Sequence, residues 1–166
     1  MPMSVLFLTE FDDEMTKTRK TLERVPAAKA EWTPHAKSTP FGKLAAHIAQ
    51  LGGFATAILT MPALDFGQGN FTPLKFESAE QLVNVFDDGV AQSRRALAGT
   101  SDSAWTEPWK LSFNGTTLFE GTRYLAYRQM YVDHLVHHRA QLGVYLRLNG
   151  QPVPSIYGPS ADESFG

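Results

Sequence analysis

The chain has 166 residues, which is enough for one domain with a self-sufficient hydrophobic core. Hydrophobic residues make up 43% and charged residues 19%, and the net charge is −2, so neither a disordered chain nor a strongly basic nucleic-acid-binding protein is indicated. Because cysteine is absent, disulfides, thiolate metal ligands and cysteine nucleophiles are excluded together.

Four segments have the apolar spacing of amphipathic helices, and the first two occupy the N-terminal third of the chain. The first is predicted from Ser4, as N-cap, to Val25, where Pro26 ends it. The second follows Ser38-Thr39-Pro40, a capping residue with a proline at an early helical position, and continues to the break at Met61-Pro62.

The third and fourth helices are separated by a connection of about twenty residues. The third is predicted to begin at the capping box Ser78-Ala-Glu-Gln81 and to end at Gly99, and the fourth to run from about Gly121 to Leu148. The dipeptide Asn114-Gly115 in the connection is a hairpin signal.

Four such helices in one chain predict the all-α class and a four-helix bundle, with long connections and a candidate short β-hairpin between the third and fourth helices. We expect residues 1–166 to form a single domain. Residues 153–166 have no helical period and are rich in Pro, Gly and Ser, which indicates an irregular C-terminal tail. The tail could pack on its own subunit or on a neighbour.

Three histidines occupy related positions on the second and fourth helices. His134 and His138 are four residues apart, so both side chains lie on one face of a helix, one turn apart. On a wheel that advances by about 100° per residue, His138 falls within the core face and His134 on its edge, whereas His137 points to the rim. The same wheel puts His47 at the edge of the apolar stripe of its helix. Two such edges can face each other across a bundle core, where metal sites are built.

Converging imidazoles predict a site for a divalent metal ion with open positions. The alternative is that each histidine pairs with a carbonyl or a tyrosine hydroxyl, as buried polar groups usually do. Three further residues are candidate ligand contacts. The Tyr131 hydroxyl could donate a proton, although the residue equally fits the core. Gln141, like Arg139, could orient a substrate or a water, or lie on a solvated face.

Longer stretches of the sequence resemble a known family. His47-Ile48-Ala49, Asp133-His-Leu-Val-His-His-Arg-Ala-Gln141 and the tail Val153-Pro-Ser-Ile-Tyr-Gly-Pro-Ser-Ala-Asp-Glu163 together resemble the DinB-like proteins of the DinB/YfiT superfamily. The resemblance implies a four-helix bundle, usually dimeric, with a divalent ion such as nickel or zinc held by His47, His134 and His138. It also implies a low-molecular-weight thiol as co-substrate, because the superfamily includes thiol-dependent transferases and isomerases.

We therefore expect a metal-dependent transferase or hydrolase that activates a thiol or water nucleophile against a small-molecule electrophile. The alternative is a non-catalytic, stress-related metal-binding bundle in which the ion is structural. The expected partners are a small-molecule substrate and a second copy of the chain, with neither nucleic acid nor membrane. No apolar run reaches the ~18–20 residues of a membrane span, and the N-terminal residues lack signal-peptide features, so a cytoplasmic location is expected.

Overall fold

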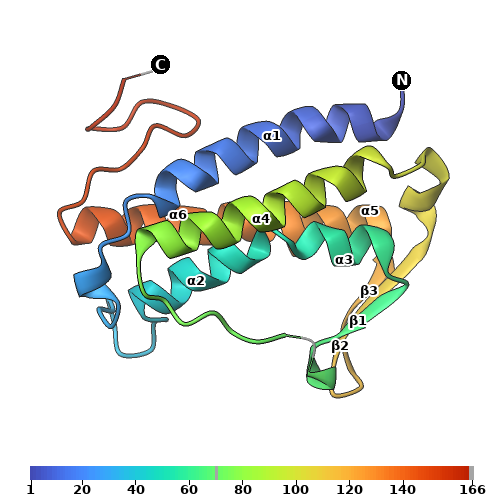
Figure 1. The fold of residues 1–166 in the computed structure, drawn as a ribbon, viewed down its shortest axis with the longest axis horizontal. Coiled ribbons are helices and arrows are strands. Elements are labelled where there is room, and N and C mark those ends of the chain that lie inside the picture. Colours follow the sequence, from blue (N-terminus) through green and yellow to red (C-terminus); the bar gives the residue numbers. More distant parts are fainter. Residues whose placement is uncertain (70, 165–166) are drawn as a thin grey trace.

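The computed structural model describes residues 1–69 and 71–164 (Figure 1). Its principal helices are α1 (Met3–Leu22), α2 (Phe41–Leu51), α3 (Phe54–Thr60), α4 (Ala79–Ala98) and α6 (Asp133–Leu148). A short turn, α5 (Arg123–Leu125), and a π-helical segment, η4 (Ala126–Val132), lead directly into α6. The strands are β1 (Ala63–Asp65), β2 (Pro108–Phe113) and β3 (Thr116–Thr122), and the 3-10 segments are η1 (Ala27–Lys29), η2 (Phe66–Gln68) and η3 (Asp102–Thr106).

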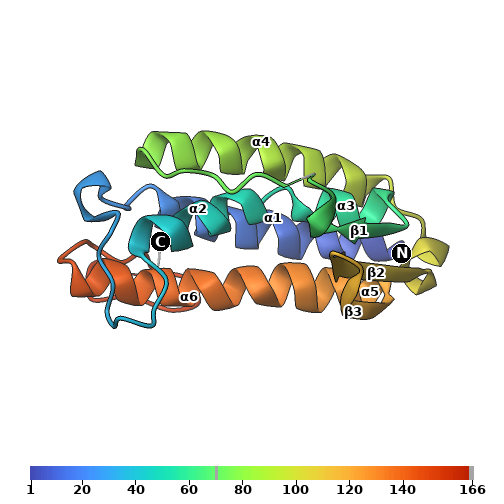
Figure 2. The same cartoon turned by 90° about the horizontal axis from the view of Figure 1, so that it is seen from below.

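The helices form an elongated bundle around a shared apolar core. Figure 2 shows α4 and α6 on opposite sides, with α1, α2 and α3 between them and the strands at one end, beside α3 and α5. Fully buried side chains from every layer meet in the centre, among them Phe11, Ile48, Leu82 and Leu142. In the described ranges, no helix combines the length and apolar character that a membrane span requires.

The predicted all-α class is wrong, because a three-stranded mixed sheet closes one end of the bundle. β1 pairs in parallel with β2, and β2 pairs antiparallel with β3. The hairpin signal at Asn114-Gly115 does mark a turn, since both residues have positive φ, 48° and 78°, as a tight hairpin of this kind requires. β1 escaped prediction because three residues are too few to show alternation, and its partner β2 lies beyond α4.

The predicted second helix is divided at Gly52-Gly53 into α2 and α3. Tertiary packing explains the division, because α4 passes so close that a Cβ on Gly89 would lie 2.6 Å from the backbone nitrogen of Gly53. The Ser93 hydroxyl on α4 donates to the carbonyl of Gly52 at 2.8 Å. A backbone acceptor near the division is thus satisfied inside the core.

The predicted fourth helix begins at Arg123 and contains the π segment. A π turn holds more residues than an α turn, so a wheel with one fixed step loses accuracy beyond the π segment. Tyr124, which a wheel with a step of about 100° puts on the core side, is 40% exposed. Tyr127 and Tyr131 are buried, with their rings near Phe7 and Phe11 of α1, respectively.

The third predicted helix is confirmed at both ends. The Ser78 hydroxyl accepts from the N–H of Gln81, whose own side chain accepts from the N–H of Glu77, and Gly99 follows the last helical residue. The first helix begins at Met3, with Pro2 rather than the predicted Ser4 at the N-cap position.

The irregular tail packs on its own subunit as far as residue 164. The N–H groups of Val153 and Ser155 donate to the carboxylates of Asp162 and Glu163, which folds the tail back on itself. Arg147 of α6 pairs with Asp162, and Arg24, just after α1, pairs with Glu163. The tail therefore connects the ends of α1 and α6.

Candidate metal centre

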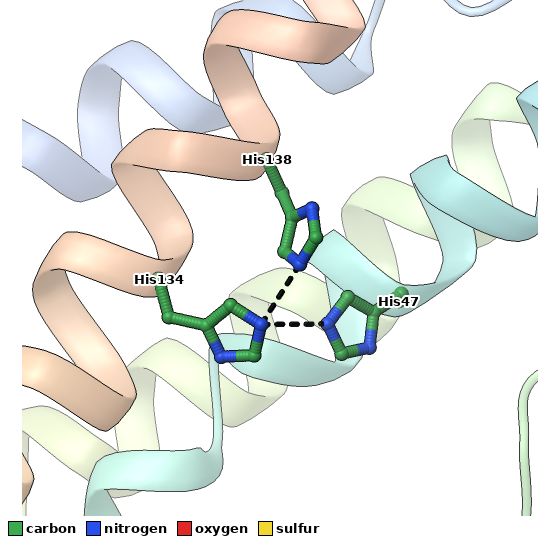
Figure 3. A group of neighbouring side chains, drawn as sticks. All are labelled: His47, His134 and His138. Carbon is green, nitrogen blue, oxygen red and sulfur yellow. Dashed lines mark hydrogen bonds between the residues drawn. The ribbon is translucent and has the colours of Figure 1, made fainter. Parts of the chain in front are cut away.

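His47, His134 and His138 converge between two helices, as Figure 3 shows. His47 comes from α2, and the other two come from the first turns of α6. The Nε2 atom of His134 lies 3.4 Å from Nε2 of His47 and 2.8 Å from Nε2 of His138. All three side chains are partly buried, and one ligand atom from each falls within 4.8 Å of the others. The structure thus brings together the three histidines selected from the sequence.

Packing at the ends of α2 and α6 fixes the distance between the histidine-bearing helices. The aromatic rings of Trp32, Phe41 and Tyr145 meet edge to face, with centroids 5.3–6.2 Å apart. The Tyr145 hydroxyl also donates to the carbonyl of Thr39, two residues before α2, at 3.2 Å. Apolar and polar contacts together therefore hold His47 opposite α6.

The hydrogen bonds on the far side of the rings set the tautomers of the two α6 histidines. Nδ1 of His134 lies 3.3 Å from the carbonyl of Met130, which can only accept, so this nitrogen carries the hydrogen. Nδ1 of His138 lies 2.8 Å from Oε1 of Gln141, also an acceptor. In the neutral rings, both Nε2 atoms then present lone pairs to each other.

Two lone pairs 2.8 Å apart repel unless a proton or a cation lies between them. The donor set fits a metal ion well, because bonds of about 2.0–2.1 Å in a tetrahedral site put neighbouring nitrogens about 3.3 Å apart. Carbonyl and amide partners satisfy Nδ1 of His134 and His138, but they leave the inward-facing Nε2 atoms without a donor of their own. The cluster is therefore able to bind a divalent ion.

Burial and mutual proximity keep these rings neutral. Desolvation, followed by the charges of His138 and His134, lowers the pKa of His47 from 6.5 to about 4. Desolvation also lowers the pKa of His134 and of His138, in each case with a further contribution from a neighbouring histidine. Neutral imidazoles are the form that binds metal, so the site favours metal over protons near neutral pH.

The remaining sequence candidates lie at different distances from this centre. Gln141 is adjacent, through its contact with His138. Tyr131 lies in the π segment, and its hydroxyl contacts the sulfur of Met15 on α1 at 3.3 Å. His137 is exposed, as the wheel predicts. Arg139 is 3% exposed and points toward α1 instead of lying on a solvated face.

A cavity of about 450 Å³, here called the apolar cavity, opens beside the histidines. His47 and His134 are among its lining residues, and most of the others are aromatic, aliphatic or thioether side chains. Three phenylalanines form its aromatic wall: Phe66 lies 6.0 Å from Phe54 and 5.4 Å from Phe71 between ring centroids. The cavity was not predicted from the sequence. Its walls come from α3, η2, β2 and the segment after residue 70, and no single hydrophobic pattern links these segments.

Gln50 belongs to the surroundings of the site but was not predicted from the sequence. It lies one turn after His47 on α2, a position that could have been noticed from the i, i+3 spacing. Its amide donates to the carbonyl of Thr72 at 2.8 Å and accepts from the N–H of Leu74 at 2.9 Å. Both ends of one side chain thus hold the loop that crosses the cavity.

A second, more polar cavity of about 340 Å³ lies on the other side of Gln50. Lys43, Thr39, Pro73 and His138 line it, together with His47 and Gln50. The histidine cluster therefore lies between two openings of different character, one apolar and one beside a lysine.

Comparisons with known proteins agree with this architecture. The chain is 23% identical over 164 residues to the uncharacterized protein YrdA of Bacillus subtilis, an alignment that covers 95% of this chain and 89% of that protein. Two crystal structures share the fold: a DinB-like protein from Bacillus cereus (TM-score 0.67, 20% identity, 91% and 95% of the two chains) and the DinB-like protein YjoA from B. subtilis (TM-score 0.66, 17% identity, 90% and 95%). The family model described as DinB superfamily matches residues 10–142. The resemblance found in the sequence is thereby confirmed, and the chain belongs to the DinB superfamily.

Proposed function

We propose that this protein is a metal-dependent enzyme in which His47, His134 and His138 hold a divalent ion, nickel or zinc, and a thiol or water nucleophile attacks a small-molecule electrophile. The observation that carries the proposal is the convergence of three imidazoles, two of which line a ligand-sized cavity. Imidazole ligands suit zinc and nickel. Bound there, the ion would supply Lewis acidity and lower the pKa of a thiol or water.

The residues around the cluster have separate tasks in this proposal. Gln141 and the carbonyl of Met130 hold the rings of His138 and His134 in the tautomer that directs Nε2 inward. The apolar walls exclude water from one side of the site. A thiol as nucleophile is favoured by the membership in a superfamily that includes thiol-dependent transferases, and a water is the nearer alternative within the same chemistry.

The adjoining cavities favour a catalytic over a structural ion. Structural metal sites are closed by protein ligands, whereas catalytic ones keep an open position. Here the cluster borders two openings. For this reason we place the non-catalytic, structural-ion alternative second.

Elemental analysis of untagged protein, purified without chelator, tests the metal centre. We expect close to one nickel or zinc ion per chain, and loss of this metal in His138→Ala. Wild-type protein that stays folded but takes up neither added ion would overturn the proposal. His137→Ala is the matched control, because this neighbouring histidine is exposed and lies outside the cluster.

Thermal shifts on the metal-loaded protein then test the thiol. A ligand of the folded state raises the apparent melting temperature by mass action. We expect a shift with at least one of glutathione, mycothiol and bacillithiol. If none of them shifts the melting temperature at high concentration, the thiol reaction is contradicted, and attack by water remains as the proposed reaction.

We further propose that the protein is a homodimer. Val5 and Leu6 on α1 are 47% and 59% exposed, and Tyr124 and Leu125 on α5 are each 40% exposed. The stacking of Phe7 on Tyr124 brings these two elements together, so the four side chains belong to neighbouring surface segments. Light scattering at micromolar concentration should give twice the monomer mass, and Leu6→Asp should reduce it; a monomeric wild type would refute the dimer.

A further inference from the structure

The lining of the apolar cavity combines a few polar groups with a large apolar surface. His47, His134 and Gln50 are its polar lining residues, and the first two belong to the histidine cluster. Phe54, Phe66 and Phe71 form its aromatic wall. A ligand in this space would therefore meet the cluster with one end and hydrocarbon with the rest of its surface.

Within the described part of the chain, no lysine, arginine, aspartate or glutamate lines this cavity. Asp65, which lies between the lining residues Leu64 and Phe66, has its carboxylate engaged elsewhere. It accepts from the N–H groups of Gly67, Asn114 and Gly115 at 2.8–2.9 Å, which joins η2 to the hairpin turn. These backbone hydrogen bonds lower the pKa of Asp65. A charged ligand group would thus find no partner along the apolar walls, and burying it there would cost free energy.

Gln50 also holds the loop that follows Phe71 in place beside the apolar cavity. Gln50 lines both cavities, as do His47 and Phe71. Through its bonds to Thr72 and Leu74, Gln50 fixes the segment that follows Phe71. The part of the aromatic wall that Phe71 supplies is therefore held by hydrogen bonds of the chain itself.

We propose that the apolar cavity binds the substrate of this site, and that the substrate is an uncharged small molecule with an aromatic or branched alkyl body and one polar group, which faces His47 and His134. The inference rests on the proposed function, because it takes the histidine cluster as the reactive centre. A volume of about 450 Å³ is within the range of small-molecule sites.

Three probes with the same body and different charge test this substrate class: naphthalenemethanol, naphthoate and naphthylmethylamine. Their affinities are measured by titration calorimetry on metal-free protein, where only the cavity lining acts, and again on zinc-loaded protein. For the metal-free protein we expect the uncharged alcohol to bind at least about tenfold more tightly than either ion, because the walls offer no counter-charge. Equal or tighter binding of an ion by the metal-free protein would overturn the proposal.

Two variants locate the binding. Ala57→Phe places a ring in the cavity, and Phe71→Ala removes part of its wall at a residue that is 41% exposed, so that folding is spared. Each should weaken binding of the alcohol at least about tenfold. Val144→Phe, at an exposed position on the outer face of α6, is the control and should leave binding unchanged. Unchanged affinity in both cavity variants would place the ligand elsewhere.

Metal content separates this inference from the proposed function. Ala57→Phe and Phe71→Ala should take up zinc like wild type, since neither side chain belongs to the histidine cluster. A wild type without metal would refute the metal-dependent reaction. A metal-binding wild type with no preference for the uncharged probe would refute only the substrate class.

Discussion

At the scale of single residues, one hydrogen bond to Gln141 sets the tautomer of His138. Its Oε1 lies 2.8 Å from Nδ1, which leaves Nε2 free to face the other two histidines. Partners of this kind orient a ligating imidazole and raise its basicity. The residue is exposed on α6, so its removal affects the ring more than the fold.

We expect Gln141→Ala to weaken zinc binding about 10- to 100-fold, because the ring of His138 loses its orienting acceptor. Titration calorimetry at pH 7.5 measures the change. Gln92→Ala, at an exposed helical position on α4, is the matched control and should bind zinc like wild type. A Gln141→Ala affinity equal to that of Gln92→Ala would show that the contact has no role.

The lowered histidine pKa values predict a pH dependence of stability in the metal-free protein. An unfolded histidine has a pKa of about 6.5, whereas the folded value for His47 is about 4. Between these values the unfolded chain binds more protons, so the free energy of unfolding falls as the pH drops through this window. Urea unfolding at several pH values should show the fall.

Replacing His47, His134 and His138 together by Gln should flatten this dependence between about pH 6.5 and 4.5. Asp162 and Glu163 have lowered pKa values and are present in both proteins. Their contribution to the pH dependence is therefore the same in wild type and variant. An equally steep dependence in the triple variant would mean that other groups are responsible.

At the scale of elements, the closest approach of two helices occurs where α4 crosses the α2–α3 junction. A Cβ on Gly89 would lie 2.6 Å from the nitrogen of Gly53 and 3.0 Å from the carbonyl carbon of Gly52. Both contacts are with backbone, which cannot turn aside as a side chain could. The junction is next to the apolar cavity, which Gly53 also lines.

We expect Gly89→Ala to lower the free energy of unfolding by about 1–3 kcal/mol, because α4 must move away from the junction. Gly99→Ala is the control, since its Cβ would meet nothing closer than 3.6 Å and its φ is −88°. Urea denaturation of both variants decides the point. Equal stabilities would show that the junction tolerates the extra carbon.

Regularity of the helices explains which parts of the site could be predicted. His134 and His138 lie in α6, after the π segment, and His47 lies in an unbroken part of α2, so a fixed step of about 100° places all three correctly. Tyr124 precedes the π segment, and the same step places it wrongly. The polar environment of Arg139 was missed because its partner Glu14 is 125 residues away in sequence.

The sheet and the cavity depended on information that no local pattern carries. β1 is defined by its parallel partner, and the cavity walls come from segments that meet only after folding. The hairpin at Asn114-Gly115 was accessible, because its turn residues act locally. The bundle was therefore predictable from periodicity, whereas the all-α assignment failed at the end where pairing is non-local.

At the scale of the whole molecule, a buried ionic network ties α1, α6 and the tail together. Arg139 and Glu14 lie 2.7 Å apart with side chains 3% and 9% exposed. The guanidinium also donates to the Tyr157 hydroxyl at 2.5 Å, and that hydroxyl donates to Glu14 at 2.8 Å. The network lies on α6 directly beside His138 in sequence, so it helps to fix the helix that bears the site.

We expect Arg139→Ala and Glu14→Ala each to lower the free energy of unfolding by about 3–5 kcal/mol, since each leaves a buried charge without its partner. The double variant Arg139→Met/Glu14→Met should lose less than the sum, because both charges are removed together. Glu23→Ala is the control, because its ion pair with Arg19 has side chains 44% exposed on both partners. If each single variant lowers the free energy of unfolding by less than about 1 kcal/mol, the network contributes no more than an ordinary surface ion pair.

The attachment of one loop to one glutamine also has a kinetic consequence. The N–H of Leu74 is bonded to Gln50 and not to backbone, so its exchange with deuterium requires the loop to detach from α2. The exchange rate of the Leu74 amide therefore measures how often the loop that carries Phe71 detaches from α2. Gln50→Ala should raise it, and a ligand enclosed by the wall should slow it. Substrate entry and amide exchange at Leu74 would then depend on the same motion of this loop.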